Sequence, residues 1–307
     1  MEFTRAVLKL FWKNTERMDN KRIASQTPTP GIKEICDIPY IDDGEKAHLL
    51  DIYYPESTKE TDKLPVIIDI HGGGWMYGYK EINKYFCLKL AERGFVVASI
   101  NYRLADTVRF YEQIQDIFAA LSFLKNELPK YPTDMDNIFL CGDSAGGHFA
   151  CVTAVTDITP DYQKDFGVES TGLNFRAIGA ICPAVDLISP NPMMNMQLGM
   201  LLGKNHKKSK FYKYMDFSQI ATYMLPPFYV VTCNGDFLRT QGYRLRDILD
   251  EYGVPNFFED YNDRLDGKKL QHVFGVVDPY TEPAAKFISA MTGYFLKNAK
   301  AAEEAEV

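Results

Sequence analysis

The chain has 307 residues, of which 46% are hydrophobic and 24% charged, and its formal net charge is −7. This composition is typical of a globular protein that is large enough to hold a core without disulfides or metals. The acidic charge argues against nucleic acid or an anionic membrane as the main partner. None of the six cysteines forms a C-x-x-C arrangement, which favours a reduced, cytoplasmic protein without metal ligands.

The first 14 residues, "MEFTRAVLKLFWKN", have apolar residues at helical spacing, but Lys9 and Lys13 interrupt them and no cleavage site follows. We expect a helix that packs on the protein's own body and not a signal peptide. A helix lying on a membrane surface is the alternative. Because no run approaches the ~18 apolar residues of a membrane span, we expect no stable membrane association.

Short strand-like segments then alternate with longer helical ones. Strands are expected near residues 35–42, 48–55, 64–70, 95–103, 137–143, 177–186, 227–235 and 256–263, and helices near 81–93, 114–128, 243–253, 283–297 and from 145 onward. Strands that are apolar on both faces and alternate with helices indicate an α/β fold with a mostly parallel sheet of about eight strands, covered by helices on both faces. One domain over residues 1–307 is the simplest organisation, with residues 1–30 and 187–225 as candidate cap elements.

The segment "CGDSAGGHF" places a serine between a predicted strand and a predicted helix. In a G-x-S-x-G turn a strained backbone pushes the serine hydroxyl clear of the sheet, and the two glycines leave room for the tight bend. A glycine-rich connecting turn without chemistry is the alternative. In this context the motif predicts Ser144 as a nucleophile.

A serine nucleophile needs a base and an acid that orients the base. Among the five histidines, His272 lies in a loop after the last predicted strand, from which it can reach back over the sheet, whereas His148 lies one turn into the serine helix and is expected to be structural. Asp236 ends a strand between Ser144 and His272, in the chain order Ser, Asp, His. Asp186 also ends a strand and is the rival acid; Asp236 could instead cap the following helix.

The segment "HGGGW" follows another predicted strand. Its glycines can turn backbone N–H groups toward the negative oxygen that forms when a carbonyl is attacked. We expect Gly73 and Gly74 to supply two donors of this oxyanion hole and Ala145, directly after the serine, to supply the third. A phosphate-binding loop is excluded because no G-K-[ST] follows.

The motifs "HGGGW", "NYRLA", "GDSAGG", "NGDFLRTQG" and "QHVF" resemble those of the hormone-sensitive-lipase-like esterases of the α/β-hydrolase fold, in the same order, over roughly residues 49–296. The resemblance implies a serine carboxylesterase for small acyl esters with a helical cap. It assigns Ser144, Asp236 and His272 to the triad. The family's usual D-P-L-x-D-E-G is replaced here by Asp236 to Gly242, and its A-P-E by residues 105–107, which affects cap and pocket contacts. A histidine directly after "GDSAGG", here His148, also resembles the pattern of bacterial acetylxylan and feruloyl esterases and of kynurenine formamidases.

The sequence thus predicts a serine carboxylic ester hydrolase that acts through an acyl-enzyme on short-chain esters, with an acetylated sugar or xylan as one possible substrate, and needs no cofactor and no metal. Trp75, Met193 and Met196 are candidates for the acyl pocket, since methionine adapts to varied shapes; core packing is an equal alternative. A ligand-binding protein on the same fold is a second hypothesis, which the presence of His272 disfavours, and an amidase or formamidase is a third. The strand at 256–261 is the candidate interface of a homodimer.

Overall fold

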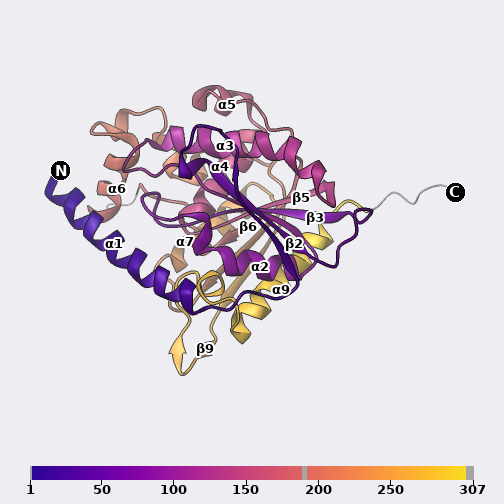
Figure 1. Ribbon diagram of the computed structural model, residues 1–307. Helices are drawn as coiled ribbons and strands as arrows, with labels where there is room; N and C mark the ends of the chain where they lie inside the picture. Colours follow the sequence, from indigo (N-terminus) through magenta and orange to yellow (C-terminus); the bar gives the residue numbers. More distant parts are fainter. Residues whose placement is uncertain (1, 189–191, 302–307) are drawn as a thin grey trace.

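The computed structural model describes residues 2–188 and 192–301 (Figure 1). It centres on an eight-stranded sheet in the order β1-β2-β4-β3-β5-β6-β7-β8. The strands are β1 (Ile32–Pro39), β2 (Leu49–Pro55), β3 (Leu64–Ile70), β4 (Val96–Ile100), β5 (Thr133–Asp143), β6 (Phe175–Ile181), β7 (Phe228–Cys233) and β8 (Asn256–Tyr261). The pairs β1–β2 and β2–β4 are antiparallel and the other five are parallel. The predicted, mostly parallel α/β sheet is therefore confirmed.

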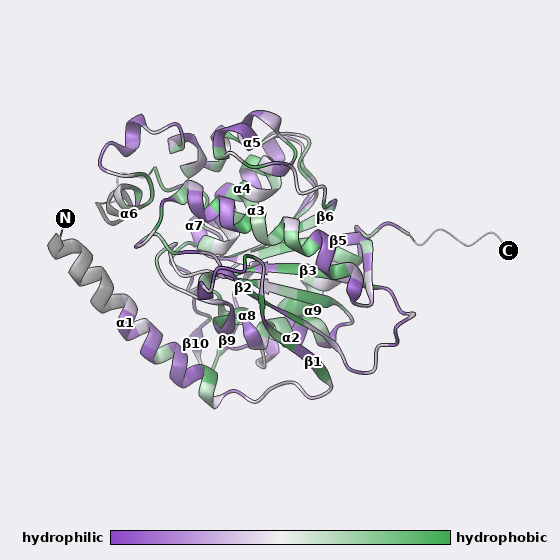
Figure 2. Ribbon diagram, turned by 45° about the horizontal axis from the view of Figure 1, so that its top comes forward, coloured by the Kyte–Doolittle hydropathy of each residue, from purple (hydrophilic) through white to green (hydrophobic). Residues whose placement is uncertain are grey.

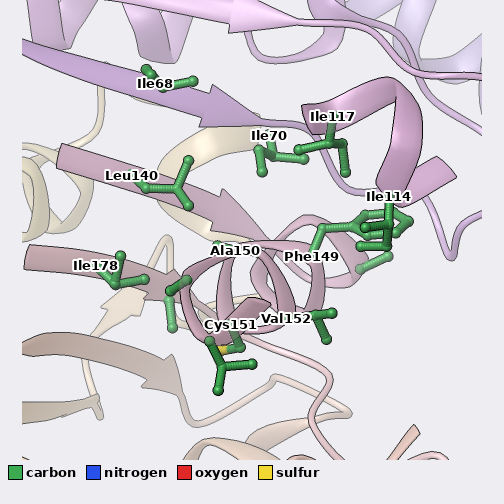
Figure 3. Packing of buried hydrophobic residues seen from close by; sticks show 14 of the residues in the cluster. Ile68, Ile70, Ile114, Ile117, Leu140, Phe149, Ala150, Cys151, Val152 and Ile178 are labelled. Atoms are coloured by element: carbon green, nitrogen blue, oxygen red, sulfur yellow. The ribbon is translucent and has the colours of Figure 1, made fainter. Parts of the chain in front are cut away.

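Helices cover both faces of this sheet, because neighbouring residues of a strand point to opposite faces and both sets are apolar. Ile68 and Leu140 pack with α3 (Phe110–Glu127) and α4 (Ala145–Asp157) on one face (Figure 3). Ile67 and Phe139 belong to the core of the other face, with α2 (Lys84–Glu92) and α9 (Glu282–Lys297). In Figure 2 the hydrophobic colour gathers on the central strands between these helices.

Several elements differ from the sequence prediction. The span 187–225, expected to be irregular, contains α6 (Pro192–Leu202) and short 3₁₀ turns. Its sequence, "PMMNMQLGMLL", is apolar on every side, so no helical alternation of polar and apolar residues marks it. The short helices α5 (Pro160–Phe166) and α8 (Phe274–Val277) and the hairpin of β9 (Arg264–Leu265) and β10 (Lys268–Lys269) were also not predicted. The helix α7 (Arg239–Glu251) begins four residues before its predicted start.

The amino-terminal helix α1 (Glu2–Ser25) lies along one side of the molecule and is longer than the sequence indicated (Figure 1). The Arg22 guanidinium donates to the carbonyl of Ile82 at 3.1 Å and to that of Val277 at 3.1 Å. Nearer the start of the helix, the Trp12 ring stacks on Tyr77 at a centroid distance of 5.3 Å. Within residues 2–188 and 192–301, no helix combines the length and apolar character that a membrane crossing requires.

Candidate active site

Ser144 occupies the sharp turn between β5 and α4. Its backbone angles, φ 54° and ψ −115°, belong to a region that residues other than glycine rarely adopt and that often marks a functional site. The Ser144 N–H donates to the carbonyl of Ile181 at 2.9 Å. A Cβ atom on Gly146 would lie 2.0 Å from the carbonyl oxygen of Ile70, so only glycine fits there. The strand and helix therefore approach closely and present the serine at the end of the sheet.

Asp236 and His272 are in direct contact at the same end of the sheet. The His272 Nδ1 atom lies 2.6 Å from Asp236 Oδ1, while Thr232 Oγ1 donates to Asp236 Oδ2 at 2.7 Å and the Leu238 N–H donates to Oδ1 at 2.8 Å. Burial would raise the pKa of Asp236, but these hydrogen bonds and the His272 charge outweigh it and lower the pKa below its ordinary value. The carboxylate thus stays charged and holds the imidazole through Nδ1.

Cys182 lies between the serine and the histidine loop. It directly follows Ile181, whose carbonyl accepts from the Ser144 N–H, and its sulfur accepts from the Val273 N–H at 3.4 Å. The charge of His272 also acts on Asp143, where it opposes the rise in pKa that burial causes. Through Ile181 and Cys182, the end of β6 thus contacts both the serine turn and the loop before α8.

The rival acid, Asp186, points elsewhere. Its carboxylate forms an ion pair with Arg244 at 3.2 Å and accepts from the Ile188 N–H at 2.9 Å. The fold therefore brings Asp236, and not Asp186, to the imidazole.

The glycine loop follows β3 at the same edge of the sheet. Gly73 and Gly74 have φ values of 113° and 60°, and a Cβ atom on Gly73 would lie 1.9 Å from the carbonyl oxygen of Tyr77. The N–H groups of Met76 and Tyr77 donate to the Gly73 carbonyl at 3.2 and 3.0 Å. The Gly73 carbonyl is thus held within the turn.

Asp143, the residue before the serine, is hydrogen-bonded to this loop. Its Oδ1 atom accepts from the Gly72 N–H at 2.9 Å and from the Asn83 amide at 2.8 Å. Asn83 also donates to the buried Asp69 at 3.0 Å. The residue next to the nucleophile is thereby linked to the loop predicted to hold the oxyanion. A carboxylate inside a buried strand end was the only sequence signal for this role.

Trp75 and His148 form a second support of the loop. The Trp75 indole N–H donates to His148 Nδ1 at 3.2 Å, and His148 Nε2 lies 2.8 Å from the carbonyl of Tyr214. This pattern requires the neutral imidazole with its proton on Nε2. Burial lowers the pKa of His148 to about 4. His148 thus has structural partners, in agreement with the expectation from the sequence.

The candidate pocket residues are placed less favourably. Trp75 is only 3% exposed, so little of its surface is open to a ligand, and its role in the pocket stays a prediction. Met193 and Met196 belong to α6, but their side chains lie outside the described residues.

The sulfur of Cys182, a carboxylate oxygen of Asp236 and a ring nitrogen of His272 lie within 4.8 Å of one another, a set that could ligate a metal. The carboxylate and imidazole already bond to each other at 2.6 Å, and burial raises the pKa of the Cys182 thiol well above its ordinary value. Because a metal prefers the thiolate and would have to break the existing bond, the arrangement suits proton transfer better. The expectation of no metal stays a prediction.

Comparison with known proteins places this geometry in a family. A family model described as BD-FAE matches residues 50–249. The probable carboxylic ester hydrolase LipM of Mycobacterium tuberculosis is 30% identical over 209 residues, which are 66% of this chain and 48% of that protein. Esterase LipC of the same organism is 35% identical over 122 residues, 39% of this chain and 30% of that one. The chain spans half or less of the length of these two curated relatives.

Among solved structures, esterase B of Lactobacillus rhamnosis (HN001) has a TM-score of 0.89 and 28% identity, and the match covers 97% of this chain and 95% of that one. A form of esterase B inhibited by a tributyrin phosphonate matches with the same TM-score, 0.89, at 29% identity, over 97% of this chain and 96% of that one. The eight-stranded sheet, the strained serine turn and the family match over residues 50–249 agree. The chain belongs to the BD-FAE family, within the hormone-sensitive-lipase-like carboxylesterases of the α/β-hydrolase fold.

Proposed function

We propose that the protein is a serine carboxylesterase that hydrolyses small esters with short acyl chains. Ser144 is the nucleophile, His272 the base and Asp236 the acid that orients it. The observation that carries the proposal is the 2.6 Å contact between Asp236 and His272 at the sheet end that also holds Ser144 in its strained turn. This combination leaves the Nε2 atom of the imidazole available for the serine proton.

In the first half-reaction the Ser144 oxygen attacks the ester carbonyl carbon and its proton passes to His272 Nε2. The negative charge moves to the carbonyl oxygen, where N–H groups of Gly73, Gly74 and Ala145 stabilise it; the loss of one such donor typically costs a factor of ~10²–10³ in rate. The bond to the alkoxy oxygen then breaks, and His272 gives its proton to the departing alcohol. In the second half-reaction water attacks the acyl-enzyme with the same base and frees the acid and Ser144.

Contacts above the glycine loop support a small acyl group. A Cβ atom on Gly74 would lie 3.0 Å from the ring of Trp12 in α1 and 3.7 Å from the amide of Gln197 in α6. These helices belong to the two segments, 1–30 and 187–225, that we propose as the cap. The tributyrin phosphonate in the esterase B structure also favours short chains. An acetyl group on a sugar or xylan is the finer proposal; a cytoplasmic location and a homodimer stay predictions.

Two alternatives use the same fold: a binding protein that does not turn over its ligand, and an amidase or formamidase. The bond between Asp236 and His272 disfavours the first, because a ligand-binding site does not need an oriented base. Rates measured on acetate esters and on the corresponding acetamides and formamides distinguish an esterase from an amidase or formamidase.

The test is hydrolysis of p-nitrophenyl acetate and butyrate by the purified wild type and by Ser144→Ala. We expect kcat to fall by at least ~10³-fold, since the remaining groups cannot replace the nucleophile. Circular dichroism and thermal unfolding check that the variant folds. A p-nitrophenyl phosphonate should react once with the wild type and not with the variant; the gain in mass is that of the phosphonate less the p-nitrophenol that departs with the serine proton. Turnover equal to the wild type would contradict the role of Ser144.

A further inference from the structure

Phe237 is a large apolar residue that is open to solvent beside the proposed base. It directly follows Asp236, and its ring centroid lies 4.2 Å from that of His272 at an interplanar angle of 46°. Its side-chain neighbours in sequence, Asp236 and Leu238, are buried, whereas Phe237 is 76% exposed. Exposed single apolar residues are common, so the position of this ring, and not its exposure alone, is informative.

The position of the Phe237 ring beside His272 matters for ester hydrolysis, so the inference rests on the proposed function. The tetrahedral carbon carries the Ser144 oxygen, the oxyanion, the acyl chain and the alkoxy oxygen. His272 must protonate the alkoxy oxygen, so the alcohol part of the ester passes next to the imidazole. Asp236 occupies Nδ1, so the proton leaves from Nε2. Phe237 contacts the same ring and therefore borders the alcohol side.

Different residues lie at the glycine loop. Trp12 and Gln197 lie over Gly74, on the oxyanion loop, whereas Phe237 lies on the histidine. Groups bound to the two sides of the ester thus meet different surfaces, an acyl side under the cap and an alcohol side at the exposed aromatic ring.

We infer that Phe237 is a specificity-determining residue that binds the alcohol part of the substrate and favours aromatic or extended apolar alcohols over small ones. Contact between two aromatic rings adds to the transfer of apolar surface from water. From the usual strength of such pairs, the contact should be worth about 3- to 10-fold in kcat/KM.

The experiment keeps the acyl group constant and varies the alcohol. Wild type and Phe237→Ala are compared on 2-naphthyl, phenyl and ethyl acetate. All three esters give the same acetyl-enzyme, so deacylation is common to them, while kcat/KM reports the steps up to departure of the alcohol. The ratio of variant to wild type for each ester cancels the intrinsic reactivity of the leaving group.

We expect kcat/KM of Phe237→Ala to fall about 3- to 10-fold for 2-naphthyl acetate and less than about 2-fold for ethyl acetate. Phe237→Leu, which keeps an apolar side chain, should lie between. Phe257→Ala is the control: Phe257 is also an exposed aromatic residue, at 47%, but it lies at the amino end of β8, at the edge of the sheet opposite to Asp236 and His272. It should leave all three values unchanged.

Two outcomes would overturn the inference. An equal loss on every ester, with a shifted pH profile of kcat/KM, would make Phe237 only a positioning residue for His272. An equal kcat/KM for wild type and variant on every ester would show that the ring binds no part of the substrate. If the wild type hydrolyses none of the esters, the proposed function itself fails, which is a different result from either.

Discussion

The carboxyl edge of the sheet and the helix α1, which belongs to the proposed cap, are held in different ways. At the edge, buried groups bond to one another: Asp143 holds Gly72 and Asn83, and Asp236 holds His272. Above it, α1 is held by the Trp12–Tyr77 stack and by side chains near its carboxyl end. The difference teaches that the groups proposed for the chemistry are fixed by buried hydrogen bonds of the core, while α1 is fixed by contacts of its own side chains.

The largest effect is expected when the acid of the proposed triad, Asp236, is removed. Asp236→Asn should lower kcat about 10⁴-fold, because the amide cannot hold the imidazole in the required tautomer. The matched variant Asp186→Asn, which removes a charge paired with Arg244, should change kcat less than about 3-fold, the scale of an exposed ion pair. Hydrolysis of p-nitrophenyl acetate measures both. A larger loss from Asp186→Asn would refute the assignment of the acid.

A second prediction tests whether the hydrogen bonds of His148 to Trp75 and Tyr214, next to the glycine loop, require a neutral imidazole. Burial lowers the pKa of His148 from 6.5 to about 4, so between these pH values the unfolded chain binds a proton that the native protein does not. The stability that His148 provides is therefore complete above pH 6.5 and is lost as the pH falls toward 4. The loss amounts to at most about 3 kcal/mol.

His148→Gln is the variant for this measurement, since its amide can accept from Trp75 and donate to the Tyr214 carbonyl without titrating. Denaturant unfolding at pH 8 and pH 4.5 should show a smaller drop in the free energy of unfolding for the variant than for the wild type. The buried His71, whose pKa is also lowered to about 4, remains in both proteins. Identical drops in the free energy of unfolding for the two proteins would show that His148 does not cause the loss of stability at low pH.

The smallest expected effect belongs to the cap. Trp12→Ala should open space over Gly74 and raise kcat/KM for p-nitrophenyl octanoate relative to the butyrate by about 5-fold. Trp12→Phe, which keeps a ring on Tyr77, should change the ratio less. A fall in kcat/KM by one factor for all chain lengths would mean that Trp12 supports the glycine loop and not the choice of acyl group.

The sheet could be predicted because its strands are continuous apolar runs between helices with a clear polar face. The serine turn and the glycine loop were visible because their backbone requires glycine at specific positions, such as Gly146 and Gly73. The role of Asp143 was not visible, since its partner Gly72 lies 71 residues away in the chain. Likewise, nothing in the local pattern pairs Phe237 with His272, and α6 lacks the polar face that marks an amphipathic helix.

The way α1 is attached couples two distant parts of the molecule. This helix of 24 residues is a stiff rod of about 36 Å. Near its middle, Trp12 lies over Gly74, where a Cβ atom on the glycine would be 3.0 Å from the indole ring. At its carboxyl end, Arg22 and the next residue after the helix, Gln26, donate to the Val277 carbonyl at 3.1 and 2.9 Å, five positions beyond His272. One helix therefore lies against both the glycine loop and the segment that follows the proposed base.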